Sequence, residues 1–396
     1  MSNRILPVLT AVLVVVLFVT GCASAPKRDL SRAVPSYVTL PNGHDPLNPD
    51  QLSPLFDPTN SGIVEGDITY YEKKRGHALN VLSLSGGGQN GAFGAGFLVG
   101  WRETGRRPEF DIVTGVSTGA LLATHAFLGS PADDTVLEEM YTQVSKDDIY
   151  RRRGIVSLAF GAHSLRDTAP LQTLIGKYIT PAVLDRVAAA YDDNRRIWIG
   201  TTNLDYDQTW VWNMTLIAKD GNLELYRKVL LASASFPIVF PPVEIDGHLL
   251  VDGAARSNLV LAGVAGKRRP EPPQYGPGNI YLIVNGKLVH APEALRKGLG
   301  DIAATTIGVM MSSSMQSMLM RAYFAARSQG YNFKMAEIPE DITIGKDPLA
   351  FDPTHMRAAF DAGRALAEKP DPWSHVPPNL GDLPVWAMDI IEDGLR

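Results

Sequence analysis

The chain has 396 residues, of which 45% are hydrophobic and 20% charged, and its formal net charge is -5. These values are ordinary for a globular protein, and the length suffices for a large buried α/β core. The strong basic excess of a nucleic-acid-binding surface is missing, so we predict no nucleic-acid partner. Short basic clusters at residues 73–75 and 151–153 are interpreted as solvated surface, with anionic lipid headgroups as the alternative.

The N-terminus has the pattern of an export signal. Arg4 precedes an apolar run over residues 5–19, which is short for a membrane-spanning helix of about 20 residues. The run ends in Val-Thr-Gly-Cys22, which resembles the lipobox of bacterial lipoproteins. That resemblance implies a signal peptide over residues 1–21 and an acylated Cys22, which is also the only cysteine. The alternative is an uncleaved anchor with an incidental cysteine.

Lipidation at Cys22 would tether the chain to a membrane through acyl chains such as palmitate. Ala23, rather than Asp, follows the cysteine. In Gram-negative lipoproteins this pattern is associated with export to the outer membrane, so we expect the protein on the periplasmic face of that membrane. Residues 22–78 are rich in Pro, Asn and Asp without a persistent helical or strand period, which predicts an extended tether that partly lies over the domain.

Regular structure is predicted from Leu79 onward, with a domain over residues 79–290 and a helical region over residues 291–396 packed on it. Predicted strands cover residues 81–85, 111–116, 196–201, 209–213, 249–252, 280–284 and 333–338. Predicted helices end near residue 105 and cover residues 118–128, 223–234, 291–327 and 356–366. This alternation favours a three-layer αβα sandwich with a mostly parallel central sheet. Met residues between 310 and 320 recur at helical spacing, which is interpreted as core packing, with a lipid-facing surface as the alternative.

Gly115-Val-Ser117-Thr-Gly119 follows an apolar strand and opens a helical segment. This strand–turn–helix setting is typical of a nucleophile elbow, whose tight turn requires glycine two positions on either side of the serine. The serine hydroxyl would point outward at a helix N-terminus, where developing negative charge is favoured. We therefore predict that Ser117 is a catalytic nucleophile.

A glycine-rich turn, with Gly86, Gly87, Gly88 and Gly91, lies between the first strand and its helix. Backbone amides at such a place bind anions, either a dinucleotide pyrophosphate or the oxyanion of an acyl-transfer reaction. The dinucleotide pattern needs an acid at the C-terminal end of the second strand, whereas Asp111 begins that strand. The oxyanion hole is therefore the favoured interpretation.

Two further blocks complete a recognisable set. Asp252-Gly253-Ala254 ends a short strand, and Ala232-Ser-Ala-Ser-Phe-Pro237 lies upstream of it. Together with the glycine-rich turn and the serine elbow, and in the same order, these blocks resemble the motifs of the patatin-like phospholipases. The resemblance covers about residues 79–286. One departure is Asn90, where many members have Lys or Arg, so charge assistance to the oxyanion from that position is in doubt.

The resemblance implies a patatin-like fold and a lipid-ester hydrolase with a Ser117–Asp252 dyad. Asp252 would accept the Ser117 proton, and the Gly87 and Gly88 amides would hold the oxyanion. An exposed carboxylate has a pKa near 4 and is a poor base, so we expect Asp252 to be desolvated. We predict no cofactor and no metal, and a membrane lipid or lipid ester as substrate, with oligomeric state left open.

Two alternatives stay open at this point. The first is a Ser-Asp-His triad that uses His290 or His355, both of which follow Asp252 in the chain. His125, in the helix after Ser117, is interpreted as structural. The second alternative is a catalytically inactive, tethered lipid-binding lipoprotein on the same fold.

Overall fold

The computed structural model describes residues 32–39, 44–45, 48–52, 68–152, 164, 166–261, 273–288, 298–343 and 347–381. The predicted signal peptide, Cys22 and His290 lie outside these ranges. Acylation of Cys22 and a role for His290 therefore stay predictions. Within the described ranges, no helix combines the length and the apolar character that a membrane-crossing segment requires.

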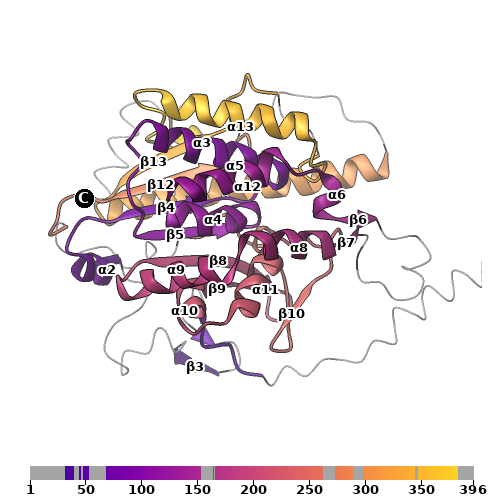
Figure 1. Cartoon of the computed structure of the whole chain (residues 1–396), viewed down its shortest axis with the longest axis horizontal. Helices are drawn as coiled ribbons and strands as arrows, with labels where there is room; N and C mark the ends of the chain where they lie inside the picture. The colour runs from indigo at the N-terminus through magenta and orange to yellow at the C-terminus, as the bar shows by residue number, and fades with distance from the viewer. Residues whose placement is uncertain are drawn as a thin grey trace, which may run out of the picture.

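A central mixed sheet organises the fold (Figure 1). Its strand order is β1-β9-β8-β5-β4-β12-β13, and a hairpin of β10 and β11 joins it through β8. The strands are β1 (Val38–Thr39), β4 (Asn80–Leu84), β5 (Ile112–Val116), β8 (Arg196–Asn203), β9 (Gln208–Asn213), β10 (Val243–Ile245), β11 (His248–Asp252), β12 (Asn279–Val284) and β13 (Asn332–Glu337). Strands β8, β5, β4, β12 and β13 run parallel, which confirms the predicted mostly parallel sheet. The other four strands pair antiparallel, which was not predicted.

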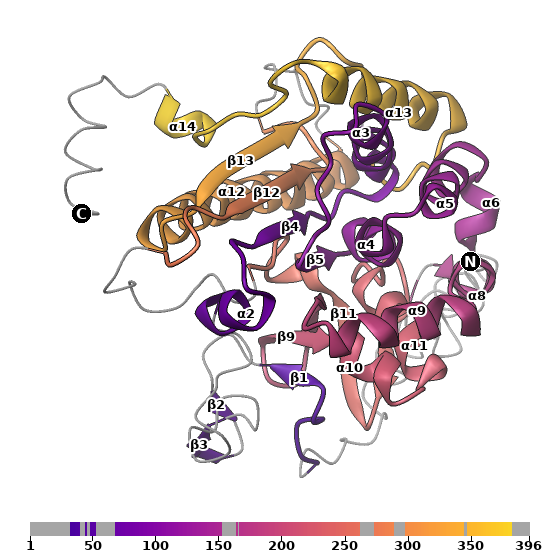
Figure 2. The same cartoon turned by 60° about the vertical axis from the view of Figure 1, so that its left-hand side comes forward.

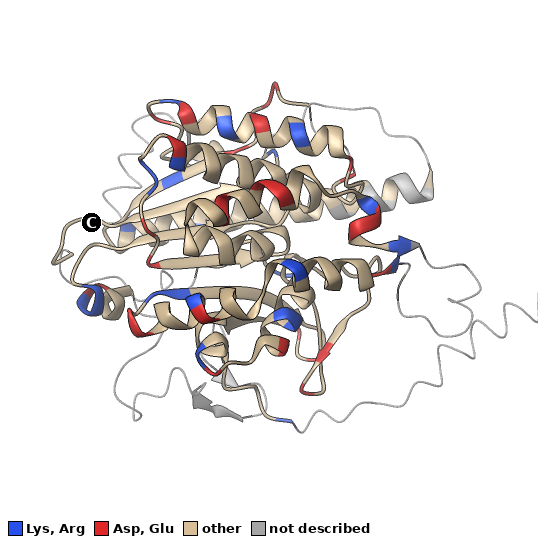
Figure 3. Ribbon diagram, in the orientation of Figure 1, with Lys and Arg blue, Asp and Glu red and all other residues tan. Residues whose placement is uncertain are grey.

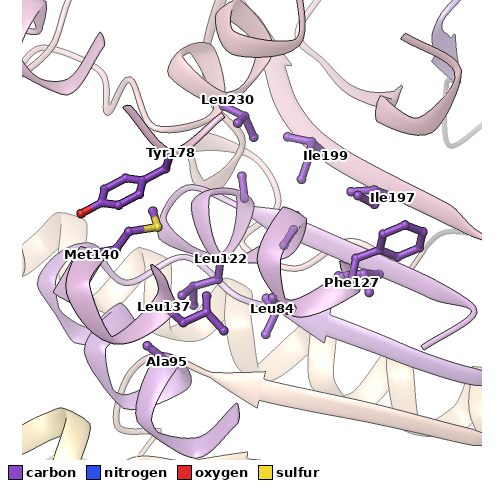
Figure 4. Packing of buried hydrophobic residues seen from close by; sticks show 14 of the residues in the cluster. Leu84, Ala95, Leu122, Phe127, Leu137, Met140, Tyr178, Ile197, Ile199 and Leu230 are labelled. Atoms are coloured by element: carbon purple, nitrogen blue, oxygen red, sulfur yellow. The ribbon is translucent and has the colours of Figure 1, made fainter. Parts of the chain in front are cut away.

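Helices cover both faces of the sheet, as Figure 2 shows. Side chains alternate along β4, so that Leu82 and Leu84 enter one hydrophobic core and Val81 enters a second core on the opposite face. In Figure 4, Leu84 and Ile199 of the sheet pack near Leu122 in the first core. That core is covered by α3 (Gly91–Glu103), α4 (Thr118–Leu128), α5 (Pro131–Thr142), α9 (Pro181–Asp192), α11 (Leu223–Ser233) and α13 (Pro353–Glu368). The second core is covered by α2 (Ile68–Arg75) and α12 (Leu299–Ser328).

Shorter elements fill the connections. They are the helices α6 (Lys146–Ile149), α8 (Ala169–Tyr178), α10 (Met214–Lys219) and α14 (Pro378–Gly381), the hairpins β2 (His44–Asp45) with β3 (Asn48–Leu52) and β6 (Arg151–Arg152) with β7 (Arg166–Asp167), and the 3-10 turns η3 (Gly88–Asn90) and η4 (Gly253–Ala255).

Regular structure begins earlier than predicted, because β1 and α2 both precede Leu79. Helix α2 has no apolar period of its own, and it is held by packing instead. Ile68 and Tyr71 are buried against the second core, and the Arg75 guanidinium donates to the buried carboxylate of Asp111 at 2.7 Å. Tertiary contacts therefore stabilise a helix that the sequence pattern does not predict.

The region beyond the predicted central domain is part of the same fold. It supplies β13 to the sheet, and α13 lies along α3 (Figure 2). The two helices approach so closely that a Cβ atom on Gly96 would lie 1.9 Å from the Phe360 carbonyl oxygen, and one on Gly363 would lie 2.1 Å from that of Phe93. Glycine at these positions is required for packing.

Candidate active site

Strand register brings Ser117 and Asp252 together on one side of β8. Strand β5 pairs with the first half of β8 and ends with Val116 opposite Gly200. Strand β11 pairs with the second half from the opposite direction and ends with Asp252 opposite Thr201. Ser117 directly follows Val116, so the two strands meet head-on and present the hydroxyl and the carboxylate to each other.

Ser117 lies in a strained turn between β5 and α4. Its backbone has φ 55° and ψ -124°, a conformation that a residue with a side chain rarely adopts. The flanking glycines are required by space, since a Cβ atom at Gly115 would lie 2.4 Å from the Gly119 carbonyl oxygen, and one at Gly119 would lie 2.3 Å from that of Leu84. The geometry is that of a nucleophile elbow.

Asp252 is buried, with 1% of its surface exposed. Its carboxylate accepts a hydrogen bond from the Ala254 N–H at 2.8 Å and another from the Ser117 side chain. Burial raises the pKa of Asp252 to about 7, and these two hydrogen bonds offset only part of that rise. The direction is the one expected from the sequence, and it gives a base whose pKa lies near neutral pH.

The glycine-rich turn offers two free amide donors. Gly86 N–H donates to the Asn258 carbonyl at 3.3 Å, and Gly91 N–H donates to carbonyls of the turn itself. The N–H groups of Gly87 and Gly88 make no hydrogen bond within the described part of the chain. Of the four predicted glycines, these two therefore keep donors for an anion. Gly91 is required for a different reason. A Cβ atom at this position would lie 2.1 Å from Thr118 Oγ1, so no side chain fits there.

Residues 347–352, in the C-terminal region, hold the glycine-rich turn through hydrogen bonds to Gln89. Gln89, 1% exposed, donates from Nε2 to the Asp347 carbonyl at 2.7 Å and accepts at Oε1 from the Asp352 N–H at 2.8 Å. Its own N–H donates to the Pro348 carbonyl at 2.8 Å. The conformation of the turn therefore depends on residues about 260 positions away in sequence.

Asn285, just after β12, also holds the glycine-rich turn, through hydrogen bonds to the residues on either side of it. Its amide donates to the Ser85 carbonyl at 2.7 Å, and its Oδ1 accepts from Gly94 N–H at 3.1 Å. Its carbonyl oxygen would lie 2.0 Å from a Cβ atom at Gly87. A side chain at Gly87 is therefore excluded.

The block from Ala232 to Pro237 supports both chemical groups. Ser233 Oγ accepts from the Ser117 N–H at 3.0 Å and donates to the Gly200 carbonyl at 2.7 Å. The Ser235 carbonyl accepts from the Asp252 N–H at 2.9 Å. One short segment at the end of α11 thus fixes the backbone of Ser117 and that of Asp252.

Sequence reasoning missed Gln89, Asn285 and Asn258 as parts of the site. Asn258 is 8% exposed, and its Oδ1 has no hydrogen-bond partner among the described residues. That oxygen would lie 2.3 Å from a Cβ atom at Gly86, whose next neighbour is Ser117 Cβ at 3.0 Å. The sequence signal for Asn258 was weak, because it is an ordinary polar residue after Ser257 and before an apolar run over residues 259–262.

The other candidate residues lie elsewhere. His355 is in the first turn of α13 with its ring 4.0 Å from the Asp352 carboxylate, and none of its described contacts is with Ser117 or Asp252. His125 is buried and bonded to Asp133 at 2.9 Å. Asp111 is held at the start of β5 by Arg75, at the end of the sheet opposite to Ser117. Across the described ranges, His, Cys, Asp and Glu form no group of three that would hold a metal ion.

A three-layer α/β fold with a serine in a strained strand–helix turn is typical of the α/β serine hydrolases. Residues 82–264 match the model of the patatin-like phospholipase family. A search of curated proteins found no match. Among solved structures, the chain is similar to VipD from Legionella pneumophila, with 10% identity and a TM-score of 0.41 over 74% of this chain. The chain spans 66% of the length of that protein.

Proposed function

We propose that the chain is a serine acyl hydrolase that cleaves carboxylic esters of lipids through Ser117 and Asp252. The observation that carries the proposal is the head-on meeting of β5 and β11, which brings Ser117 beside the buried carboxylate of Asp252. Burial raises the pKa of that carboxylate to about 7. The match of residues 82–264 to the model of the patatin-like phospholipase family supports a lipid substrate.

In this mechanism Asp252 accepts the Ser117 proton as Oγ attacks the ester carbonyl carbon. The carbonyl oxygen becomes an oxyanion and is held by the Gly87 and Gly88 N–H groups, which have no other described acceptor. Collapse of the tetrahedral intermediate expels the alcohol, which takes the proton from Asp252. Water, deprotonated by Asp252, then attacks the acyl-enzyme. Collapse of this second intermediate releases the fatty acid, and Asp252 returns the proton to Ser117 Oγ.

We also propose that the chain is anchored in a membrane through an acylated Cys22, on the periplasmic face of the outer membrane. The proposal rests on the lipobox-like sequence and on the Ala23 that follows it. Metabolic labelling with an alkyne fatty acid tests it, because the label should appear in the wild type and be lost in Cys22→Ala.

The function is tested with the full chain on a dissolved short-chain ester and on phospholipid. We expect Ser117→Ala and Asp252→Asn each to lower kcat/KM by about 10³-fold or more, while both variants remain folded and unfold cooperatively. His355→Ala serves as the matched control and should keep activity, as should the wild type in EDTA. Loss of activity in His355→Ala or in His290→Ala would favour a triad instead. A wild type that is inactive on every ester yet binds lipid would favour a lipid-binding lipoprotein.

A further inference from the structure

Five of the six large apolar side chains exposed in the described residues lie on the side of the molecule that carries the site. They are Leu204, Ile238, Ile302, Val309 and Met310, which together we term the apolar rim. The sixth, Tyr275, precedes β12 and so lies at the opposite edge of the sheet. Single exposed apolar residues need no explanation, but their collection at one edge does.

Two members of the apolar rim flank the pair of Ser117 and Asp252. Leu204 follows β8, whose Thr201 is opposite Asp252, and it is 48% exposed. Ile238 comes three residues after Ser235 and is 71% exposed. Its φ of 71° lies in the left-handed region, which a β-branched residue strongly disfavours. An isoleucine that is both strained and exposed is unfavourable in water and indicates a functional constraint.

The other three members are on α12, which passes the site and continues beyond it. Ser257 Oγ donates to Met318 Sδ at 3.0 Å, which fixes Met318 beside the loop after Asp252. The C-terminal end of α12 leads to β13, which begins at the far edge of the sheet, so residues before Met318 extend past the site. At a rise of 1.5 Å per residue, Met310 lies about 12 Å beyond Met318 and Ile302 about 24 Å. Figure 1 shows this end of α12 extending past the neighbouring helices.

The projecting part of α12 has no charged residue from Ile302 onward. From Ile302 to Met320 the sequence has no Asp, Glu, Lys or Arg, and the described residues of this end are tan in Figure 3. A site for anionic headgroups would need Lys or Arg, and a protein partner is usually met by an apolar centre within a polar rim. Exposed Ile, Val and Met side chains without a neighbouring charged residue are stabilised when they leave water for the apolar part of a lipid layer.

We propose that the apolar rim docks on a lipid surface, so that the ester reaches Ser117 directly from the lipid layer. This inference rests on the proposed function, because only a lipid substrate makes such docking useful at this edge.

The docking is tested with an environment-sensitive fluorophore on the full chain carrying Met310→Cys, in phosphatidylcholine vesicles with quenchers on the acyl chains. Asp361→Cys on α13 is the matched control, because its exposed side chain lies on the opposite face of the sheet. The wild type, whose only cysteine is Cys22, is put through the same labelling and supplies the background. We expect a blue shift and quenching at position 310 that persist at about 1 M salt, and neither at position 361. A water-exposed probe at position 310 on vesicle-bound protein would overturn the proposal. The proposal would also be overturned if, without vesicles, the probe at position 310 became shielded from water as the protein concentration rose. The apolar rim would then be a contact between copies of the chain.

A second measurement separates docking from chemistry. The triple variant Ile302→Gln, Val309→Gln and Met310→Gln should hydrolyse a dissolved short-chain ester within about twofold of the wild type and lose about tenfold on vesicle phospholipid. Equal rates on vesicles for variant and wild type, or equal losses on both substrates, would overturn the proposal. A wild type that hydrolyses neither ester refutes the proposed function, whereas the fluorescence experiment still reports whether the rim docks.

Discussion

Two buried aspartates hold opposite ends of α4, and they differ in what surrounds them. Asp252 contacts Ser117 at the N-terminal end of the helix, and Asp133 contacts His125 near its C-terminal end. Their exposed fractions are nearly equal, at 1% and 2%. Burial alone would therefore raise the pKa of both carboxyl groups.

The hydrogen-bond partners of each carboxylate decide whether its pKa is raised or lowered. Burial is opposed at Asp133 by hydrogen bonds from His125, Arg186 and Ser130, which together hold the pKa of Asp133 well below its usual range. Asp252 has only a hydroxyl and one backbone N–H, so burial prevails and raises its pKa to about 7. A buried carboxylate with cationic partners is a structural anchor, whereas one without them is suited to accept a proton.

The largest expected effect is on stability, at Asp133. Asp133→Asn removes the charge that pairs with Arg186 and weakens the hydrogen bond with His125, and we expect the free energy of unfolding to fall by about 3 kcal/mol. Denaturant unfolding measures it. Asp148→Asn is the matched control, since Asp148 caps α6 in the same way but is exposed and has no described cationic partner, so it should cost less than about 1 kcal/mol. Equal losses in the two variants would show that capping alone accounts for Asp133.

The second prediction concerns pH, where the two aspartates should act with opposite sign. The raised pKa of Asp252 means that its stabilising contribution is present below the unfolded value of about 4 and is lost as pH rises through about 7. Asp252→Asn should therefore gain stability relative to the wild type between pH 5 and 8, by up to a few kcal/mol. The contribution of Asp133 is instead present above about pH 4 and lost in acid. Unfolding curves at the two pH values measure the difference, and a gain that is independent of pH would contradict it.

The same titration should govern activity. Asp252 must be ionised to accept the Ser117 proton, so kcat/KM should fall about tenfold per pH unit below about 7. The pH–rate profile of the wild type on a dissolved ester measures this dependence. A midpoint near pH 4 would show that Asp252 behaves as an exposed carboxylate.

The parts of the site that the sequence predicted are those encoded by local geometry. A turn as tight as the one at Ser117 excludes a Cβ atom at Gly115 and Gly119, and this requirement is visible in five consecutive residues. The apolar runs of the parallel strands were equally visible, because strands buried on both faces are continuously hydrophobic. The predicted mostly parallel sheet was therefore confirmed.

The remainder depends on contacts between distant segments. The antiparallel approach of β11 to β8 follows from long-range pairing, which a short apolar run does not specify. Gln89 gave no signal because its partners, at positions 347 and 352, are ordinary loop residues. Helices α5 and α9 were not predicted, although both begin with proline preceded by a Ser or Thr N-cap, which is a recognisable start signal.

The smallest expected effect concerns Ser233, whose hydroxyl holds the backbone of Ser117. Ser233→Ala removes the acceptor of the Ser117 N–H and leaves that buried donor and the Gly200 carbonyl without this partner. We expect kcat to fall about tenfold, with KM nearly unchanged, because the strained turn at Ser117 loses a restraint while the substrate surface is intact. Ser235→Ala is the matched control from the same block. Its hydroxyl bonds only to the Leu231 carbonyl within the described residues, and its own carbonyl still accepts from Asp252 N–H. If both variants lose the same activity, the effect belongs to the packing of α11 and not to the hydrogen bond that holds Ser117.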